Sequence, residues 1–320
     1  MNQTILKKFS VSENDFLGEG GEAWVYKLDQ NRILKLYKNN DLNKNMIGQQ
    51  RLLARLKFQQ LQLSPLAILK WDVVDNTLYS IEKRVEGIDL SKSLQKLQGA
   101  ERFAALDSFY DGAMKISKLY ESKRCYFKEA IHANGYPRSK HWPTFLAGVA
   151  CKTLFRKFSN LERKELLEIF ATRCGNINYS KAPELVHFDY FPANVIEYEG
   201  RVVAVIDYSL AIFGDPLLDV AGAVGYLPLE DRVTDRDYKH LLKMMFDHHT
   251  KEDITTMTTY LIYMAIYWSG CDSSRVAEWS AVIIDAWRKD NYKGSDTAIW
   301  EAITPKAKIK REGARYVSDM

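Results

Sequence analysis

The spacing of three polar residues near the middle of the chain constrains the fold more than any other feature of the sequence. Asp189 and Asn194 lie in the segment HFDYFPAN at 187–194, between two β-rich apolar runs, and Asp207 ends a third such run. Tight turns between short neighbouring strands bring residues at such spacings to the same end of a small sheet. We therefore expect the three side chains to converge on one site.

These three side chains offer a carboxylate beside two further oxygen ligands. Phosphoryl transfer needs a carboxylate that orients the attacking hydroxyl, and it needs hard oxygen ligands for the Mg²⁺ on the phosphates. As isolated residues, Asp189 and Asn194 could equally be turn formers or caps. Their spacing relative to Asp207 favours the phosphoryl-transfer interpretation.

The first 84 residues predict a small, mostly β unit with one helix. Two pairs of apolar and aromatic runs, each pair joined by a polar turn, indicate two hairpins. These runs span residues 23–28, 32–37, 71–74 and 77–84. Between the hairpins, residues 45–63 carry leucines and an isoleucine near the 3.6-residue period of a helix.

The remainder of the chain is predicted to be mainly helical around a small β island at 185–206. Helices are expected at 103–120, 143–158, 161–171, 216–226, 235–248, 254–269 and 274–290. The apolar run at 260–268 is too short to span a bilayer and is expected in the core. The sequence thus predicts an α+β, bilobal architecture: a β-rich N-lobe at 1–84 that binds nucleotide, and a larger, mainly helical C-lobe at 85–320.

A glycine-rich loop, GEGGEAWV at 18–25, lies between two predicted strands. Glycines let a backbone approach a phosphate closely and donate N–H groups to it. No helix follows and no GK[ST] is present, so neither a Rossmann turn nor a P-loop fits. The spacing matches a kinase-type loop, while a glycine-rich hairpin without a ligand is the alternative. The residues expected at the nucleotide are Gly18, Gly20, Gly21 and Val25.

Lys35 stands in the apolar strand segment ILKL at 33–36. A lysine that points inward is costly unless it meets an anion, and a nucleotide phosphate is such an anion. An exposed lysine on an alternating strand is the alternative.

Taken together, these residues make the chain resemble the aminoglycoside phosphotransferase and choline kinase family, whose fold is protein-kinase-like. HFDYFPAN at 187–194 is similar to the family's H-G-D-x-H-x-x-N, IDY at 206–208 to I-D-W/F, and GDPLLDVA at 214–221 to G-D-P-x-x-D-L-A. The last motif favours the small-molecule branch over protein kinases, whose D-F-G and A-P-E are missing. The resemblance spans about residues 14–225.

The resemblance implies roles for the residues that match the motifs. Asp189 is expected to be the catalytic base, Asn194 and Asp207 to hold Mg²⁺, and Lys35 to contact the phosphates of ATP. Asp219 is expected to brace the catalytic loop.

The segment YSIEKR at 79–84 is similar to the family's hinge, whose backbone reads adenine. Glu82 and Arg84 are therefore expected near the nucleotide.

Two departures from the family pattern stand out. Phe188 replaces the motif glycine, so bulky aromatics, Phe188 and Tyr190, flank the expected base. The helix glutamate that usually pairs with the phosphate-holding lysine falls on Gln49, and no glutamate stands between residues 36 and 81. We therefore expect the pairing of Lys35 to be weaker or differently made.

The predicted function is an ATP-dependent O-phosphotransferase that acts on a small hydroxylated molecule, such as an aminoglycoside, an amino alcohol or a sugar or glycolipid. A catalytically weak, pseudokinase-like nucleotide-binding or regulatory module is the alternative, and Gln49 is the feature that favours it. ATP and Mg²⁺ are the expected cofactors.

The acceptor is left open by two opposed charge patterns. Residues 122–182, the family-variable substrate segment, interleave basic residues with aromatic ones, which favours an anionic or sugar-like acceptor or a peripheral contact with a membrane surface. The C-terminal helices carry acidic residues with Tyr263, Tyr267 and Trp268, which favour a cationic acceptor. Solvated helix faces would give both patterns.

Charge and cysteine content limit which ligands the protein is expected to bind and in which cellular compartment it is expected. Residues 1–181 hold 30 Lys+Arg and 19 Asp+Glu, whereas residues 182–320 hold 15 Lys+Arg and 22 Asp+Glu. A basic first half suits a polyanion such as a nucleotide. An unevenly charged, solvated surface is the alternative. The net charge of +4 is too small to imply nucleic acid. Four scattered cysteines and an N-terminus without an apolar signal core predict a cytoplasmic protein.

Overall fold

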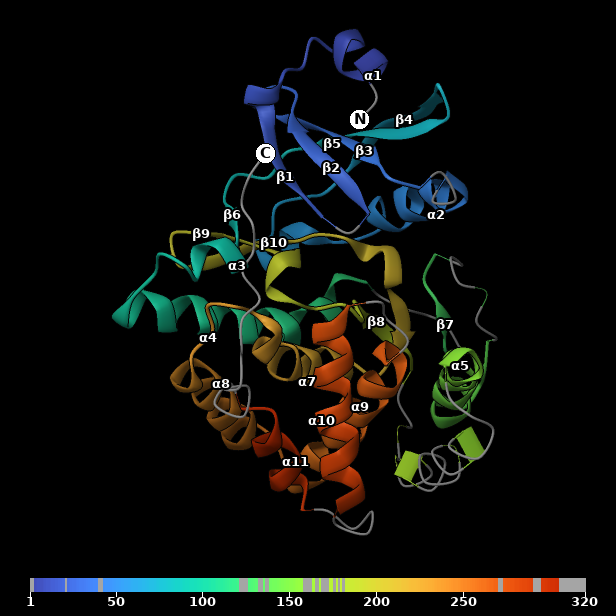
Figure 1. The fold of residues 1–320 in the computed structure, drawn as a ribbon, viewed down its shortest axis with the longest axis vertical. Helices are drawn as coiled ribbons and strands as arrows, with labels where there is room; N and C mark the ends of the chain where they lie inside the picture. The colour runs from blue at the N-terminus through green and yellow to red at the C-terminus, as the bar shows by residue number, and fades with distance from the viewer. Residues whose placement is uncertain are drawn as a thin grey trace.

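The fold is taken from a computed structural model, which places a β-sheet above a larger body of helices (Figure 1). The residues that it describes are 3–20, 22–39, 43–120, 126–131, 135, 138–157, 163–164, 167, 173–174, 177, 179, 182–269, 273–289 and 295–304.

The sheet of the N-lobe has the strand order β1-β2-β3-β5-β4, with every neighbouring pair antiparallel. Its strands are β1 (Phe16–Glu19), β2 (Ala23–Lys27), β3 (Arg32–Tyr37), β4 (Ile68–Val74) and β5 (Thr77–Lys83). Asp75 and Asn76 join β4 to β5 with positive φ angles, as a tight hairpin turn requires. Both predicted hairpins are confirmed.

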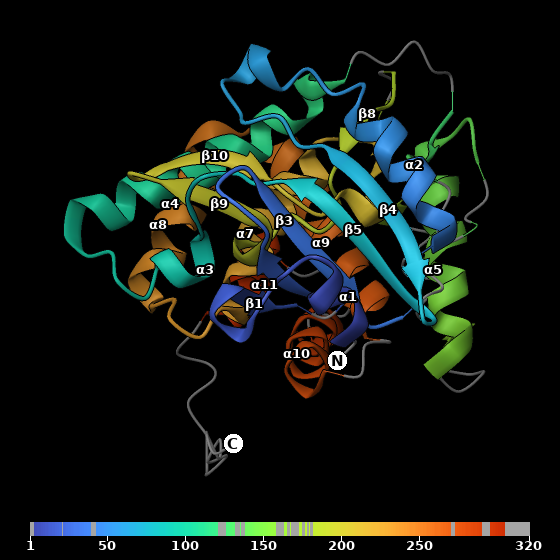
Figure 2. The same cartoon turned by 90° about the horizontal axis from the view of Figure 1, so that it is seen from above.

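The two faces of this sheet have different neighbours because side chains alternate along each strand. Leu34 and Leu36 of β3 lie on the outer face and pack against α1 (Gln3–Lys8), which covers that face (Figures 1 and 2). Tyr37 lies on the inner face with Met46 of α2 (Asn43–Leu53). Lys35 shares this inner face, so it points toward the C-lobe side.

The helix predicted at 45–63 is shorter than the spacing of its apolar residues suggested. It ends at Leu53, and a separate 3-10 turn follows at Phe58–Leu61. Leu56 and Phe58 are buried against the C-lobe core, so they are apolar for packing and not for helix periodicity.

The C-lobe is formed mainly by helices. These are α3 (Leu90–Ser93), α4 (Gly99–Lys115), α5 (Trp142–Lys157), α7 (Leu217–Gly225), α8 (Asp235–His248), α9 (Lys251–Trp268), α10 (Ser274–Lys289) and α11 (Asp296–Ala302). The predicted helices match α4, α5 and α7 to α10, while the one predicted at 161–171 lies largely outside the described residues. The run at 260–266 is buried in α9, which confirms a core helix. Among the described residues, no helix has the length and apolarity needed to cross a membrane.

The predicted β island divides into two small sheets. In one, β9 (Val195–Tyr198) pairs with β10 (Arg201–Val205) and with β6 (Ile88–Asp89). In the other, β11 (Ile212–Gly214) lies between β7 (Lys128–Glu129) and β8 (Glu184–Val186). The sequence did not predict β6, β7 and β11 because two or three residues are too few to show a period.

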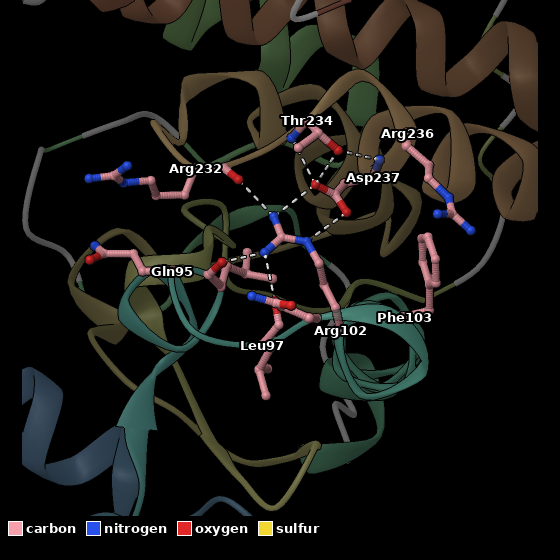
Figure 3. Close-up of a pocket in the computed structure, with 11 residues that line it drawn as sticks. Gln95, Leu97, Arg102, Phe103, Arg232, Thr234, Arg236 and Asp237 are labelled. Atoms are coloured by element: carbon pink, nitrogen blue, oxygen red, sulfur yellow. Dashed lines mark hydrogen bonds and ion pairs between the residues drawn. The ribbon is translucent and has the colours of Figure 1, made fainter.

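A buried ion pair joins α4 to the start of α8 (Figure 3). The Arg102 guanidinium makes two 2.8 Å hydrogen bonds to the Asp237 carboxylate, and it also donates to the main-chain carbonyls of Leu94 and Arg232. Burial opposes the charge of Asp237, but Arg102 and then Thr234 outweigh it and hold the pKa of this carboxyl below its ordinary value. These groups border a cavity of about 400 Å³ that includes none of the candidate site residues.

Arg102→Ala is expected to lower the free energy of unfolding by about 3–5 kcal/mol, because it leaves a buried carboxylate without its cation. Urea unfolding followed by tryptophan fluorescence measures this change. Arg236→Ala is the matched control, since Arg236 borders the same cavity but is exposed and lies over the Phe103 ring. Equal effects of the two substitutions would contradict the assigned role of the ion pair.

Candidate active site

The loop after β8 is fixed by a buried carboxylate on α7. Asp219 accepts hydrogen bonds from the main-chain N–H of His187 at 2.7 Å and of Phe188 at 2.8 Å. Burial raises the pKa of Asp219 to about 7, although these two donors oppose the rise. His187 is fully buried, and its Nε2 lies 2.8 Å from the carbonyl oxygen of Ile206. The loop is thus tied to both α7 and the end of β10, which is the bracing expected of Asp219.

Phe188 turns the chain sharply just before Asp189. Its φ of 71° lies in the left-handed region, where a bulky residue is strained and the family motif has glycine. The buried ring packs edge-on against Tyr267 at 4.9 Å. Tyr190 is also buried, with its ring stacked on Phe109 at 4.8 Å. Both aromatics are therefore packed in the core on either side of Asp189.

Asp189, Asn194 and Asp207 come together as the sequence predicted. The Nδ2 of Asn194 donates to the Oδ2 of Asp189 at 2.9 Å and to its main-chain oxygen at 3.0 Å. Burial raises the pKa of Asp189 to about 6, the nearby charge of Asp207 adds to the rise, and Asn194 opposes it. Asp207 itself has a left-handed φ of 63° and accepts a 3.3 Å hydrogen bond from the N–H of Ser209.

Lys35 reaches the same site from the N-lobe. Its Nζ lies 3.0 Å from the Oε2 of Glu82 on β5. Burial opposes the charge of Lys35, but Glu82, then Tyr37 and Asp207, together raise its pKa above the ordinary value. The charge of Asp207 therefore acts on this lysine from the C-lobe. The carboxylate that pairs with Lys35 comes from β5 and not from a helix, so the pairing is differently made, as expected.

Most of the segment predicted as a hinge is instead a central strand. Residues 79–82 of β5 pair with β3 on one side and with β4 on the other, so their main-chain groups are used within the sheet. The chain leaves the sheet after Lys83, where the N–H of Arg84 bonds to Asn31. A linker that could read adenine with its backbone therefore begins at Arg84, and the side chain of Glu82 faces Lys35.

The glycine-rich loop lies close to these carboxylates. The N–H of Gly20 donates to Ala23 at 2.9 Å and closes the turn between β1 and β2. Burial raises the pKa of the Glu22 carboxyl to about 7, with Asp207 adding to the rise and Lys35 opposing it. Glu22 as a whole is exposed, but its carboxyl interacts with the charges of Asp207 and Lys35, which the sequence did not predict.

The strand register places Gly18 and Val25, two of the predicted loop residues, in one row with Lys35 across the sheet. Val25 pairs with Gly18 on β1 and with Lys35 on β3. Gly21 lies outside the described residues. The register also explains why Glu82, which the sequence placed near the nucleotide, meets Lys35: Lys35 pairs with Ser80, and residues two apart share a face.

Two oxygens of this cluster suit a divalent cation. The amide nitrogen of Asn194 is used by Asp189, which leaves Oδ1 as an acceptor, and Asp207 offers a carboxylate oxygen beyond the one held by Ser209. Within the described residues no group of three or more His, Cys, Asp or Glu could hold a metal alone. Mg²⁺ usually takes one or two protein carboxylates together with substrate phosphates, so this donor set fits it.

The acidic residues of the C-terminal helices are largely used within the protein. Asp231 pairs with Arg275, Asp235 with Lys239 and Asp247 with Lys243, and Asp253 caps α9. The aromatic residues lie differently: Tyr267 packs on Phe188, and Trp268 donates to the Tyr226 hydroxyl at 2.7 Å. These aromatic side chains thus form a cluster beside Asp189, in which Phe188 and Tyr226 are buried and Tyr267 and Trp268 are partly exposed.

Only part of the basic segment at 122–182 is described. Within it, Arg138 and Lys140 both lie over the ring of Tyr126, at 5.2 and 5.8 Å from its centre.

A bilobal fold with a glycine-rich loop, an ion-paired strand lysine and three converging oxygen groups has the arrangement of a phosphotransferase. Residues 16–248 match the Phosphotransferase enzyme family (APH), and this match covers more than half of the chain. The chain belongs to that family, which confirms the resemblance seen in the sequence.

Individual relatives agree with this assignment. The chain is 25% identical over 168 residues to hygromycin-B 4-O-kinase of Escherichia coli, a match that spans 48% of this chain and 45% of that protein. Its fold is similar to a thermostable mutant of aminoglycoside phosphotransferase APH(4)-Ia in ternary complex with AMP-PNP and hygromycin B, at a TM-score of 0.65 and 18% identity, covering 96% and 98% of the two chains. A streptomycin–ATP–APH(2")-IIa complex gives a TM-score of 0.52 at 18% identity, covering 88% and 94%. These neighbours confirm the predicted bilobal α+β fold.

Proposed function

We propose that the protein transfers the γ-phosphoryl group of ATP to a hydroxyl of a small polyhydroxylated amine of the aminoglycoside class. The observation that carries the proposal is the cluster of Asp189, Asn194 and Asp207 with Lys35 beside it. Family membership and the relatives that act on or bind hygromycin B support the same reading.

In this proposal each residue of the site has its own role toward the metal or the phosphates. Asn194 and Asp207 would hold Mg²⁺, which neutralises charge on the phosphates when it is bound. Lys35 contacts the phosphates, and Gly18, Gly20, Gly21 and Val25 form the loop above them.

Asp189 takes the proton of the acceptor hydroxyl. Its Oδ2 is held by Asn194, so Oδ1 is the oxygen left for the acceptor. Arg84 begins the linker beside the adenine. The side chain of Glu82 serves the site through Lys35.

Tyr267 and Trp268, the partly exposed members of the aromatic cluster, would give the acceptor a surface beside the Asp189 loop. Aromatic faces attract ammonium groups, and sugar rings stack on them, so these two side chains suit an amino sugar better than a simple anion. The charge pattern that favoured an anionic acceptor lies in the segment 122–182, which is described only in part.

The alternative of a regulatory nucleotide-binding module depended on the absence of a glutamate at position 49. Because Glu82 supplies Lys35 with a carboxylate at 3.0 Å, this feature no longer favours it.

The test is an ATP-consumption screen across aminoglycosides, amino alcohols, sugars and glycolipid precursors, with product mass measured for each hit. We expect consumption to depend on an aminoglycoside and the product to gain one phosphate. Phosphorylation of only a sugar or a lipid precursor would keep the phosphotransferase and reject the acceptor class. No consumption with any acceptor would reject the proposal.

The pKa of Asp189 predicts the acid limb of the pH profile. Since this pKa is raised to about 6, the carboxylate that accepts the proton is lost as the pH falls below that value. We expect kcat/KM for ATP, which reports the free enzyme, to fall about tenfold for each pH unit below about 6. A flat profile down to pH 5 would contradict the assignment of Asp189 as the base.

A further inference from the structure

The helix that faces the site from the N-lobe contains no acidic residue. The sequence of α2, NKNMIGQQRLL, has neither aspartate nor glutamate, and Gln49 stands where the family's pairing glutamate was expected. A phosphate-contacting lysine that has no carboxylate partner would lose part of its fixed position. The protein therefore needs another element to hold Lys35.

Strand β5 provides that element. Lys35 of β3 pairs directly with Ser80 of β5, so Glu82, two residues further on, lies on the same face of the sheet. The distance of 3.0 Å between Lys35 Nζ and Glu82 Oε2 joins side chains that are only 21% and 16% exposed. An ion pair of this burial is stronger and less screened than a surface pair.

The other carboxylate oxygen of Glu82 is fixed independently. The Ser80 hydroxyl donates to Oε1 at 2.7 Å, and the Tyr37 hydroxyl donates to the same atom at 3.3 Å. Ser80 and Tyr37 are themselves buried, with 0% and 7% of their surfaces exposed. Each oxygen of Glu82 thus has its own partner, which restricts the carboxylate to one orientation toward Lys35.

We propose that Glu82, oriented by Ser80 and Tyr37, is the positioning residue that holds the phosphate-contacting Lys35, in place of a glutamate on α2. Lys35 and Glu82 lie on strands that are hydrogen-bonded neighbours in one sheet. The pair therefore forms within the sheet and needs no residue of α2. This inference rests on the proposed function, because it assigns Lys35 to the phosphates.

The first measurement is the Mg²⁺-ATP affinity and the kinetics of Glu82→Gln, which keeps the shape and removes the charge. We expect the Mg²⁺-ATP dissociation constant and kcat/KM to worsen by about tenfold or more, the loss ascribed to one hydrogen bond to a charged group. The matched control is Glu278→Gln, the same change at an exposed position on α10, and it should stay within about twofold of wild type. Glu82→Gln binding ATP as tightly as wild type, or more tightly, would overturn the proposal and make Glu82 a competitor of the phosphates.

The second measurement does not need nucleotide. Labelling of lysines with acetic anhydride at pH 8, followed by mass spectrometry, reports how available each amine is. We expect Lys35 to label about tenfold faster in Glu82→Gln than in wild type, because loss of the carboxylate lowers the pKa of the amine. An unchanged rate at Lys35 would overturn the pairing. If wild type neither binds nor consumes ATP, the proposed function fails while this arm still decides the pairing.

A third variant covers the case in which Glu82→Gln does not fold. Ser80→Ala combined with Tyr37→Phe keeps the charge of Glu82 but removes the two donors that orient it. We expect kcat/KM to fall about threefold to tenfold. The melting temperature of the double variant should be close to those of the two single variants. Wild-type kinetics in the double variant would overturn the role of these two residues.

Discussion

Asp189→Asn is expected to remove phosphoryl transfer while leaving Mg²⁺-ATP binding nearly intact. Asparagine keeps the shape of the side chain and its contact with Asn194, but it loses the charge and the affinity for a proton. Turnover should fall by about 10²–10⁴-fold, the contribution of a general base. The dissociation constant for Mg²⁺-ATP should move by less than about tenfold, since Asn194 and Asp207 are the proposed metal ligands.

Turnover on the acceptor found by the screen and calorimetry with Mg²⁺-ATP measure the two halves of this prediction. Asp111→Asn, the same change at an exposed position on α4, is the matched control and should behave as wild type. Loss of ATP binding together with turnover would make Asp189 a metal ligand. Retained turnover would remove the base from the proposed mechanism.

The residues that carry the chemistry were accessible from the sequence because their spacing is local. Asp189 and Asn194 belong to one loop, and Asp207 ends the hairpin that follows, so two short turns determine how they meet. The helices α8 and α10 were also predicted nearly to the residue, and α9 to within three residues, since each has a long amphipathic or apolar pattern, and Thr234 and Thr250 cap α8 and α9. Local chemistry of this kind needs no knowledge of tertiary contacts.

The features that the sequence did not reveal depend on register and packing between distant segments. Glu82 meets Lys35 only because β3 and β5 are neighbours in a sheet whose strand order is not the chain order. The segment at 79–84 has the composition of a hinge, yet its pairing on both sides makes it a central strand. Phe188 at a positive φ is equally unpredictable, because packing against Tyr267 and the bonds to Asp219 sustain a strained backbone.

Asp207→Ala is expected to abolish the dependence of nucleotide binding on Mg²⁺. In wild type, Mg²⁺ should strengthen ATP binding because the cation joins the phosphates to Asp207 and Asn194. Without the carboxylate, Asn194 alone offers a neutral oxygen, which is a poor anchor for a cation that keeps much of its hydration shell. We expect Mg²⁺-ATP affinity to fall about a hundredfold or more, since a metal contact of this kind contributes several kcal/mol.

Calorimetry with ATP in Mg²⁺ and in EDTA separates this effect from general damage. The variant should bind ATP weakly and equally in both buffers, whereas wild type should bind far more tightly with Mg²⁺. Asp207→Asn keeps the side-chain oxygen that accepts from Ser209 while removing the charge, so it controls for loss of the local turn and should lose Mg²⁺ dependence as well. Because Asp207 contributes to the raised pKa of Asp189, either substitution should also shift the titration of Asp189 toward lower pH. Mg²⁺ dependence that survives in both variants would place the metal elsewhere in the cleft, and Glu22, whose carboxyl lies near the same charges, would be the next residue to replace.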